Sequence, residues 1–171
     1  MSTSDEILGL AAREKYWKFA QAYLAASERQ CKAISENEEL FGYPDGAVCL
    51  YLAQHAIELF LKGMLISRKP DAVNNVHQIS QLEREFKAIF TEPEFKWDVP
   101  FSELVDWASV PKDQRIPHDQ LLRYPTKKGV TEWSSHWQGF GAQAFLGSLN
   151  RIREDFFRLQ HAEKIRSNKM P

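Results

Sequence analysis

The chain has 171 residues, a net charge of −1 and a hydrophobic fraction of 43%. This length and composition predict one folded globular domain and argue against a disordered chain. The near-zero net charge excludes a global attraction to nucleic acid or to an anionic membrane, so any such attraction has to be local.

Three further features of the sequence limit the possible sites and the cellular location. Cys31 and Cys49 both fall in apolar helical patterns, where buried free thiols of a cytosolic protein are expected and one disulfide is the alternative. The two cysteines and five histidines show no spacing typical of metal ligands, so no metal or cofactor is predicted. The polar, acidic N-terminus does not resemble a signal peptide, which favours a cytoplasmic protein.

The first predicted helix begins near Thr3, which stands three residues before Glu6 as in a capping box. The helix is expected to end near Ser35, and residues 37–46, which are rich in Gly and Pro, are expected to form a loop. One helix face recurs at three- and four-residue steps and consists of Leu10, Trp17, Ala20, Leu24, Ser27, Cys31 and Ile34.

Residues 47–66 predict a helix that is apolar on most of its circumference, as in a central buried helix. The helix is expected to stop near Pro70, after the basic residues Arg68 and Lys69. Its length approaches that of a membrane span, but its polar residues and the mean hydropathy of −0.46 for the chain argue against one. At about 100° per residue, one polar stripe occupies an arc of about 100° and consists of Tyr51, Gln54, His55, Glu58 and Lys62.

This polar stripe has two possible explanations. Glu58 and Lys62 have the i,i+4 spacing, acid first, that favours an ion pair on a helix. The stripe is then either the one solvent window of the helix, or it faces a cleft or a symmetric partner helix. In the second case its polar groups bind a ligand or fix the register, since a buried charge is costly without a partner.

Two more helices follow. The third is expected to be capped by Asn74 or Asn75, to bury Ile79, Leu82, Phe86 and Ile89, and to end in a turn at residues 91–94. Residues 100–130 predict a long irregular segment with one short helical run, and such long loops tend to be functional. The last helix is expected to start after Gly141 and to fray over residues 164–171. Its buried face has the clearest spacing and consists of Ala142, Phe145, Leu149, Ile152, Phe156 and Leu159.

These elements predict an all-α protein, a four- to five-helix up-and-down bundle with a loop-rich insertion before the last helix. Residues 1–171 are expected to form this single domain. The apolar helix faces exceed what one small bundle buries easily, so a homodimer is expected. A group of aromatic residues supports this expectation and consists of Trp133, Trp137 and Phe140.

Three motifs in order resemble the HEPN family, helical domains named for their occurrence in higher eukaryotes and prokaryotes and for nucleotide binding. They are the Gln54/Glu58/Lys62 stripe, a His-x-hydrophobic pattern at His77, and Arg123-Tyr124-Pro125. The resemblance runs from residue 47 to the C-terminus and is nearest to the partners of minimal nucleotidyltransferases. It implies a bundle that commonly dimerises, with a cleft near the polar stripe. The paired nucleotidyltransferase would be a separate protein.

Some HEPN proteins are ribonuclease toxins that use a closely spaced Arg and His near the start of the last helix. This chain departs from that pattern, because its three Arg–His pairs are too close together, too far apart or too near the C-terminus. The pairs are Arg115 with His118, Arg123 with His136 and Arg158 with His161. We therefore expect no catalytic residues. A divergent ribonuclease using Arg123, His118 or His136 remains the alternative.

Three of the expected ligand-binding residues have two possible roles each. Pro125 holds Tyr124 in an extended conformation, so that Arg123 and the ring can bind a phosphate and a base, or Arg123 can clamp the loop onto Glu58. Lys62 is either the ion-pair partner of Glu58 or a phosphate ligand. His77 near a helix start either caps and packs there or acts as a general base. The expected set is Gln54, Glu58, Lys62, His77, Arg123 and Tyr124.

The sequence thus predicts a cytoplasmic, dimeric, prokaryotic HEPN-type bundle that binds a nucleotide, RNA or a protein partner without catalysis, in a toxin–antitoxin or defence-type system. The first alternative is the divergent ribonuclease. The second is a purely structural adaptor in which the stripe only pairs helices.

Overall fold

The structure is a computed structural model that describes residues 9–73, 76–100 and 141–169. Within these ranges it contains four α-helices, three short 3₁₀ helices and no strand, so the predicted all-α class is confirmed. The α-helices are α2 (Ala12–Glu36), α3 (Tyr43–Arg68), α4 (Ile79–Ile89) and α6 (Ala142–Lys169). The 3₁₀ helices are η1 (Glu38–Leu40), η2 (Pro70–Val73) and η3 (Pro93–Phe95).

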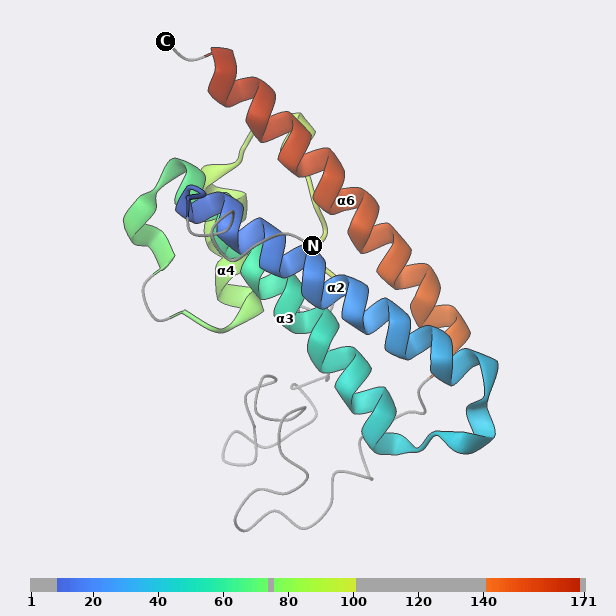
Figure 1. The fold of residues 1–171 in the computed structure, drawn as a ribbon. Coiled ribbons are helices and arrows are strands. Elements are labelled where there is room, and N and C mark those ends of the chain that lie inside the picture. The colour runs from blue at the N-terminus through green and yellow to red at the C-terminus, as the bar shows by residue number, and fades with distance from the viewer. Residues whose placement is uncertain (1–8, 74–75, 101–140, 170–171) are drawn as a thin grey trace, which may run out of the picture.

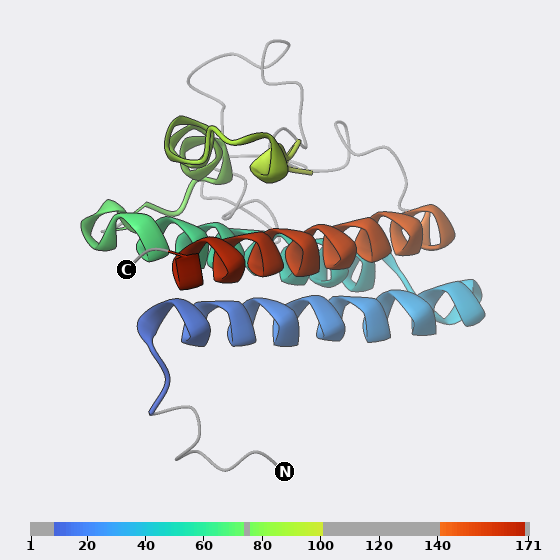
Figure 2. The same ribbon diagram turned by 90° about the horizontal axis from the view of Figure 1, so that it is seen from above.

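Three long helices, α2, α3 and α6, lie side by side as a bundle (Figure 1). α3 runs antiparallel to α2, and α6 runs in the same direction as α3. The shorter helix α4 packs on α3, on the side away from α2 (Figure 2). α3 therefore contacts all three other helices, as its nearly all-round apolar sequence predicts.

The first helix is shorter than predicted. It begins at Ala12 because Gly9 and Leu10 form a turn and a bend, and glycine has low helix propensity. The predicted capping box lies outside the described residues. From Trp17 to Ile34 the predicted apolar face is confirmed, since its six members in this range are the buried residues of α2.

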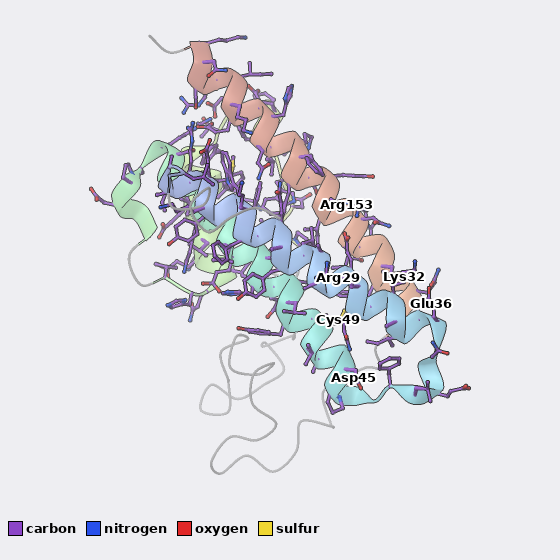
Figure 3. The ribbon with its side chains drawn as sticks, viewed as in Figure 1. Arg29, Lys32, Glu36, Asp45, Cys49 and Arg153 are labelled. Atoms are coloured by element: carbon purple, nitrogen blue, oxygen red, sulfur yellow. The ribbon has the colours of Figure 1, made fainter. Side chains whose placement is uncertain are left out.

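The central helix starts earlier than predicted, at Tyr43 instead of residue 47. Asp45 lies in its first turn (Figure 3), and the Asp45 Oδ2 atom accepts a hydrogen bond of 2.9 Å from the backbone N–H of Gly42. Pro44 also fits the first turn, where its missing N–H has no intrahelical partner to lose. The loop predicted for residues 43–46 is therefore wrong, because these residues start the helix. The helix ends at Arg68, as predicted.

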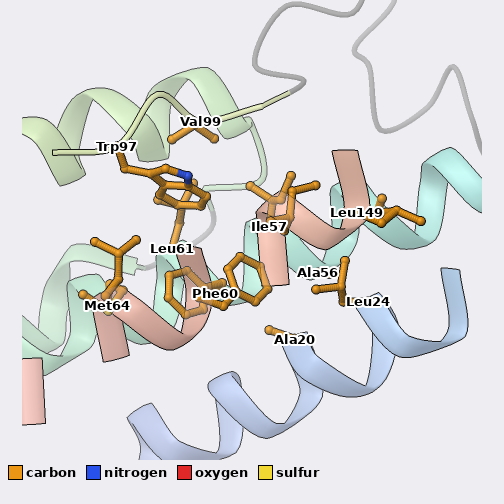
Figure 4. Packing of buried hydrophobic residues seen from close by; sticks show 14 of the residues in the cluster. Ala20, Leu24, Ala56, Ile57, Phe60, Leu61, Met64, Trp97, Val99 and Leu149 are labelled. Atoms are coloured by element: carbon orange, nitrogen blue, oxygen red, sulfur yellow. The ribbon is translucent and has the colours of Figure 1, made fainter. Parts of the chain in front are cut away.

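The core joins α3, α6 and the segment after η3 through aromatic rings. The rings of Phe60 and Phe156 are stacked with centroids 3.9 Å apart, and Trp97 meets both rings edge-on. The indole N–H of Trp97 donates to Asp155 Oδ2 at 3.1 Å, so its polar atom is satisfied. Figure 4 shows Phe60 and Trp97 together with other members of this core, which come from α2, α3 and α6.

The third helix starts at Ile79 with no side-chain cap. Its N-cap residue is Gln78. Asn74 and Asn75, which were predicted to cap this helix, lie outside the described residues. The predicted apolar face is confirmed for Leu82 and Phe86, which are fully buried. The residues after the helix form η3, which confirms the predicted turn.

The last helix buries all six residues of its predicted face. It continues to Lys169, so the predicted fraying over residues 164–169 is wrong. The reason is an anchor in its last turns, where Arg166 donates two hydrogen bonds to the carboxylate of Glu163, at 2.9 and 2.7 Å.

Helices α2 and α3 are in close contact where Gly63 faces Trp17. A Cβ atom at Gly63 would lie 2.6 Å from Trp17 Cδ1 and 2.7 Å from Trp17 Nε1. The absence of a side chain at Gly63 therefore permits this contact.

Residues Pro44–Arg68 of α3 are long and apolar enough to cross a membrane by composition alone. However, 72% of the most apolar window is buried inside the protein. The core helix of a soluble protein meets the same criterion, so this is weak evidence for a membrane span.

Candidate functional site

The polar stripe of α3 contains a network centred on the carboxylate of Glu58. Lys62 Nζ lies 2.7 Å from Glu58 Oε1, and His77 Nδ1 lies 3.0 Å from the same oxygen. His55 Nδ1 lies 3.4 Å from the other oxygen, Oε2. Three nitrogen-bearing side chains therefore converge on one carboxylate.

The network is mostly buried. Glu58 is 4% exposed and Lys62 is 7% exposed, so the solvent-window explanation of the stripe is wrong for these two residues. Burial raises the pKa of Glu58, but the contacts with His55, Lys62 and His77 outweigh burial and bring it to about 2. Glu58 is therefore ionised at neutral pH, and Lys62 neutralises it inside the bundle.

His77 brings the network to the surface. It lies in the segment between η2 and α4, 19 residues from Glu58 in the chain, and its side chain is 61% exposed. Its Nδ1 atom contacts the buried carboxylate, while most of its side chain is exposed to solvent. The structure thus joins three of the predicted ligand-binding residues: Glu58, Lys62 and His77.

Gln54 occupies the same stripe, one turn before Glu58. It is 5% exposed, and its Nε2 atom is buried without a hydrogen-bond partner among the described residues. A buried amide without a partner is costly and calls for an explanation. A bound molecule that accepts a hydrogen bond from Gln54 would supply one.

The other predicted site residues lie outside the described residues. These are Arg123 and Tyr124, and the same holds for the ribonuclease alternatives His118 and His136 and for the aromatic group of Trp133, Trp137 and Phe140. Their predicted roles therefore stay predictions.

His55 is a member of the network that the sequence reasoning placed in the stripe but not in the candidate site. Its ring is held by two aromatic neighbours: Tyr23 of α2 meets it edge-on at 4.5 Å, and Tyr51 stacks on it at 5.8 Å. The i,i+3 spacing of His55 and Glu58 was a signal for their contact.

A second buried network joins α3, α4 and α6 and was missed by sequence reasoning. Arg68 lies 3.2 Å from the fully buried Glu163 and 2.9 Å from Glu92. Its guanidinium carbon also lies 3.9 Å from the ring centroid of Phe90. Burial raises the pKa of Glu163, but Arg166, Ser67 and Arg68 outweigh it, so that the pKa is lowered.

A signal for this second network was present in the sequence. Glu163 continues the three- and four-residue spacing of the buried face of α6 beyond Leu159, and a carboxylate on such a face requires a cation. All the polar atoms of the Glu163 carboxylate are used by neighbouring side chains. The network therefore holds helices together and is not a candidate ligand site.

The two cysteines are free and buried, as expected. Cys49, labelled in Figure 3, donates from its Sγ to the backbone oxygen of Ser27 on α2 at 3.2 Å. Cys31 donates to the backbone oxygen of Ala142 on α6 at 3.2 Å. Burial, and then Cys49, raise the pKa of Cys31 to about 12. Both thiols therefore serve packing, and neither has the lowered pKa of a reactive cysteine.

Among the described residues, no group of three or more His, Cys, Asp or Glu side chains is placed to hold a metal ion. Comparison of the chain with protein-family models, with curated proteins and with solved structures finds no match. The function therefore has to be argued from the geometry of the Glu58 network.

Proposed function

We propose that this protein is a non-catalytic helical bundle of the HEPN type that binds a nucleotide or RNA through the polar stripe of α3. The observation that carries the proposal is the convergence of Lys62, His55 and His77 on the buried carboxylate of Glu58. This polar network interrupts an otherwise apolar central helix, where burying charged groups is costly unless they are paired.

The chemistry of the network suits an anionic ligand. Lys62 has three N–H donors and directs one of them at Glu58, while the exposed edge of His77 offers a further polar contact. Gln54 adds a buried amide donor without a partner in the described part of the chain. Arg123 and Tyr124 would complete the site with a fork for a phosphate and a ring for a base.

Calorimetric titration at low salt with AMP, ATP and a short RNA tests the proposal. We expect binding that weakens with added salt, because charge-assisted contacts at a partly exposed site are screened. Replacing His77 with Gln is expected to weaken binding without unfolding the protein, since His77 is largely exposed. Lys62→Met is the stronger test of charge, provided that its circular dichroism matches the wild type.

Lys87→Met is the matched control, because Lys87 forms an i,i+4 ion pair with Glu83 on α4, remote in the chain from the stripe. It is expected to bind as the wild type does. Absence of binding by all three ligands, or equal binding by the His77→Gln and Lys62→Met variants, would overturn the proposal and favour the structural adaptor.

The proposed function also implies protein partners and a cellular setting. We expect a cytoplasmic homodimer in a toxin–antitoxin or defence-type system, with a separate nucleotidyltransferase as a further partner. Co-purification of this chain with a nucleotidyltransferase encoded beside it would test that partnership directly.

A ribonuclease is the second candidate, and the contact between His77 and Glu58 favours it. A largely exposed imidazole held through one nitrogen by a buried carboxylate is the arrangement of an acid–base histidine. Incubation with labelled RNA distinguishes the candidates: the binding proposal expects no cleavage. Cleavage that His77→Gln abolishes, and that the control His161→Gln on the exposed face of α6 retains, would favour the enzyme.

A further inference from the structure

A pocket of about 280 Å³ lies between α2 and α3, beside the Glu58 network. It is lined by Lys15, Tyr16, Phe19, Tyr23, His55 and Leu59. Its α2 residues lie on a different flank of that helix from Gln21 and Glu28, which contact α6. The pocket is therefore a separate feature of the surface of the α2–α3 pair, connected to the network through His55.

Four of the six residues that line the pocket carry rings. The ring of His55 meets Tyr23 edge-on, and its Nδ1 atom lies 3.4 Å from Glu58 Oε2. Phe19 is 50% exposed, so one large apolar ring stands open beside this wall. Rings arranged in this way favour a planar ligand, which stacks on them without ordering mobile side chains.

The wall of the pocket contains one positively charged side chain. Lys15 lines the pocket, and Lys18 precedes Phe19 on the same helix; no ion-pair partner is found for either lysine in the described part of the chain. On α3, the carboxylate of Glu58 beside His55 is already paired with Lys62. A ligand with an anionic group attached to its planar ring is therefore complementary in charge as well as in shape.

The size of the pocket selects the class of ligand. Its volume of about 280 Å³ lies just below the range of roughly 300–1,000 Å³ that is typical of ligand pockets. That space suits one ring system with a substituent and is too small for a helix of a partner protein.

We propose that this pocket is a base-binding subsite for a purine mononucleotide, with the base stacked against Phe19 and the wall formed by Tyr23 and His55, and the phosphate near Lys15. The inference rests on the proposed nucleotide-binding function and names a part of its site that the sequence motifs do not contain. His55 connects the two parts, because it lines the pocket and also contacts Glu58.

Calorimetric titration with AMP, adenosine and ribose 5-phosphate, compared in the same buffer, tests the subsite. AMP is expected to bind most tightly, adenosine more weakly, and ribose 5-phosphate weakest of the three. Phe19→Ala is expected to weaken AMP and adenosine by about tenfold or more, since base–aromatic stacking contributes strongly to binding. Lys15→Met is expected to weaken AMP only, by a few-fold, and this loss shrinks as salt is added.

Phe157→Ala is the matched control, because Phe157 is also an exposed phenylalanine, 60% exposed, on α6. Unchanged AMP binding in both Phe19→Ala and Lys15→Met, with loss in Lys62→Met or His77→Gln, would overturn the subsite and leave the proposed function standing. Loss in the two pocket variants with unchanged binding in the stripe variants would support the pocket and overturn the polar stripe as the ligand site. No binding of any probe would overturn both.

Discussion

Replacing Glu58 with Ala is expected to destabilise the protein strongly, because Lys62 would then be a buried charge without its partner. Glu58 is 4% and Lys62 is 7% exposed, and removing one partner of a buried pair costs about 3–5 kcal/mol. The pKa of Glu58 gives a similar magnitude: a fall from 4.5 to about 2 corresponds to about 3 kcal/mol. We therefore expect the free energy of unfolding to fall by about 3–5 kcal/mol at neutral pH.

The same contacts are expected to make the free energy of unfolding fall at acid pH. Because the pKa of Glu58 is depressed in the folded state, its stabilisation is complete above the ordinary value of 4.5 and is lost as the pH falls toward about 2. The wild type is therefore expected to lose more stability over this pH range than a Glu58→Gln variant, which lacks the titrating group.

Urea denaturation followed by circular dichroism measures these changes. Glu83→Ala is the matched control, because Glu83 forms an i,i+4 pair with Lys87, whose side chain is 52% exposed; its expected cost is below about 1 kcal/mol. The double variant Glu58→Leu/Lys62→Met is expected to be more stable than Glu58→Ala, since it leaves no buried charge. A Glu58→Ala cost no larger than that of Glu83→Ala would refute the reasoning.

Three further predictions follow from other parts of the molecule. Gly63→Ala is expected to lower the free energy of unfolding by about 1–3 kcal/mol, because the new Cβ would lie 2.6 Å from Trp17 Cδ1. Gly147→Ala, on the exposed side of α6, places its new Cβ with no atom within 4 Å and is expected to raise the free energy of unfolding by up to about 1 kcal/mol. Urea denaturation measures both changes. Cys31 and Cys49 are expected to react with a thiol reagent only after unfolding, since both are buried and the pKa of Cys31 is about 12; rapid labelling of the native protein would contradict this. Light scattering at micromolar concentration is expected to give about twice the chain mass of 19.8 kDa, and a monomer mass would contradict the proposed homodimer.

Helix periodicity determined much of the fold. The buried faces of α2 and α6 follow the three- and four-residue spacing in the sequence, because only residues on one side of a helix can face a common core. The same local geometry placed Lys62 within reach of Glu58, since residues four apart on a helix are neighbours. The sequence also identified α3 as central from its nearly continuous apolar surface.

Helix ends were less predictable, because the same residues signal a loop or a helix start according to context. Pro44 and Gly46 favour loops, yet both lie in the first turns of α3, where the bond between Gly42 and Asp45 stabilises the start. The end of α6 was likewise decided by the contact of Arg166 with Glu163.

Contacts between distant residues were decided by the tertiary structure alone. Periodicity along one helix gives no information about which residues of another helix or loop face it. His77 therefore contacts Glu58 only because α4 packs on α3. In the same way, Arg68 contacts Glu163 only because α3 and α6 lie side by side. The pocket formed by Phe19, Tyr23 and His55 likewise exists only because α2 and α3 pack with these faces together. The sequence by itself determined the helices and their buried faces, and the packing of those helices determined which side chains share a site.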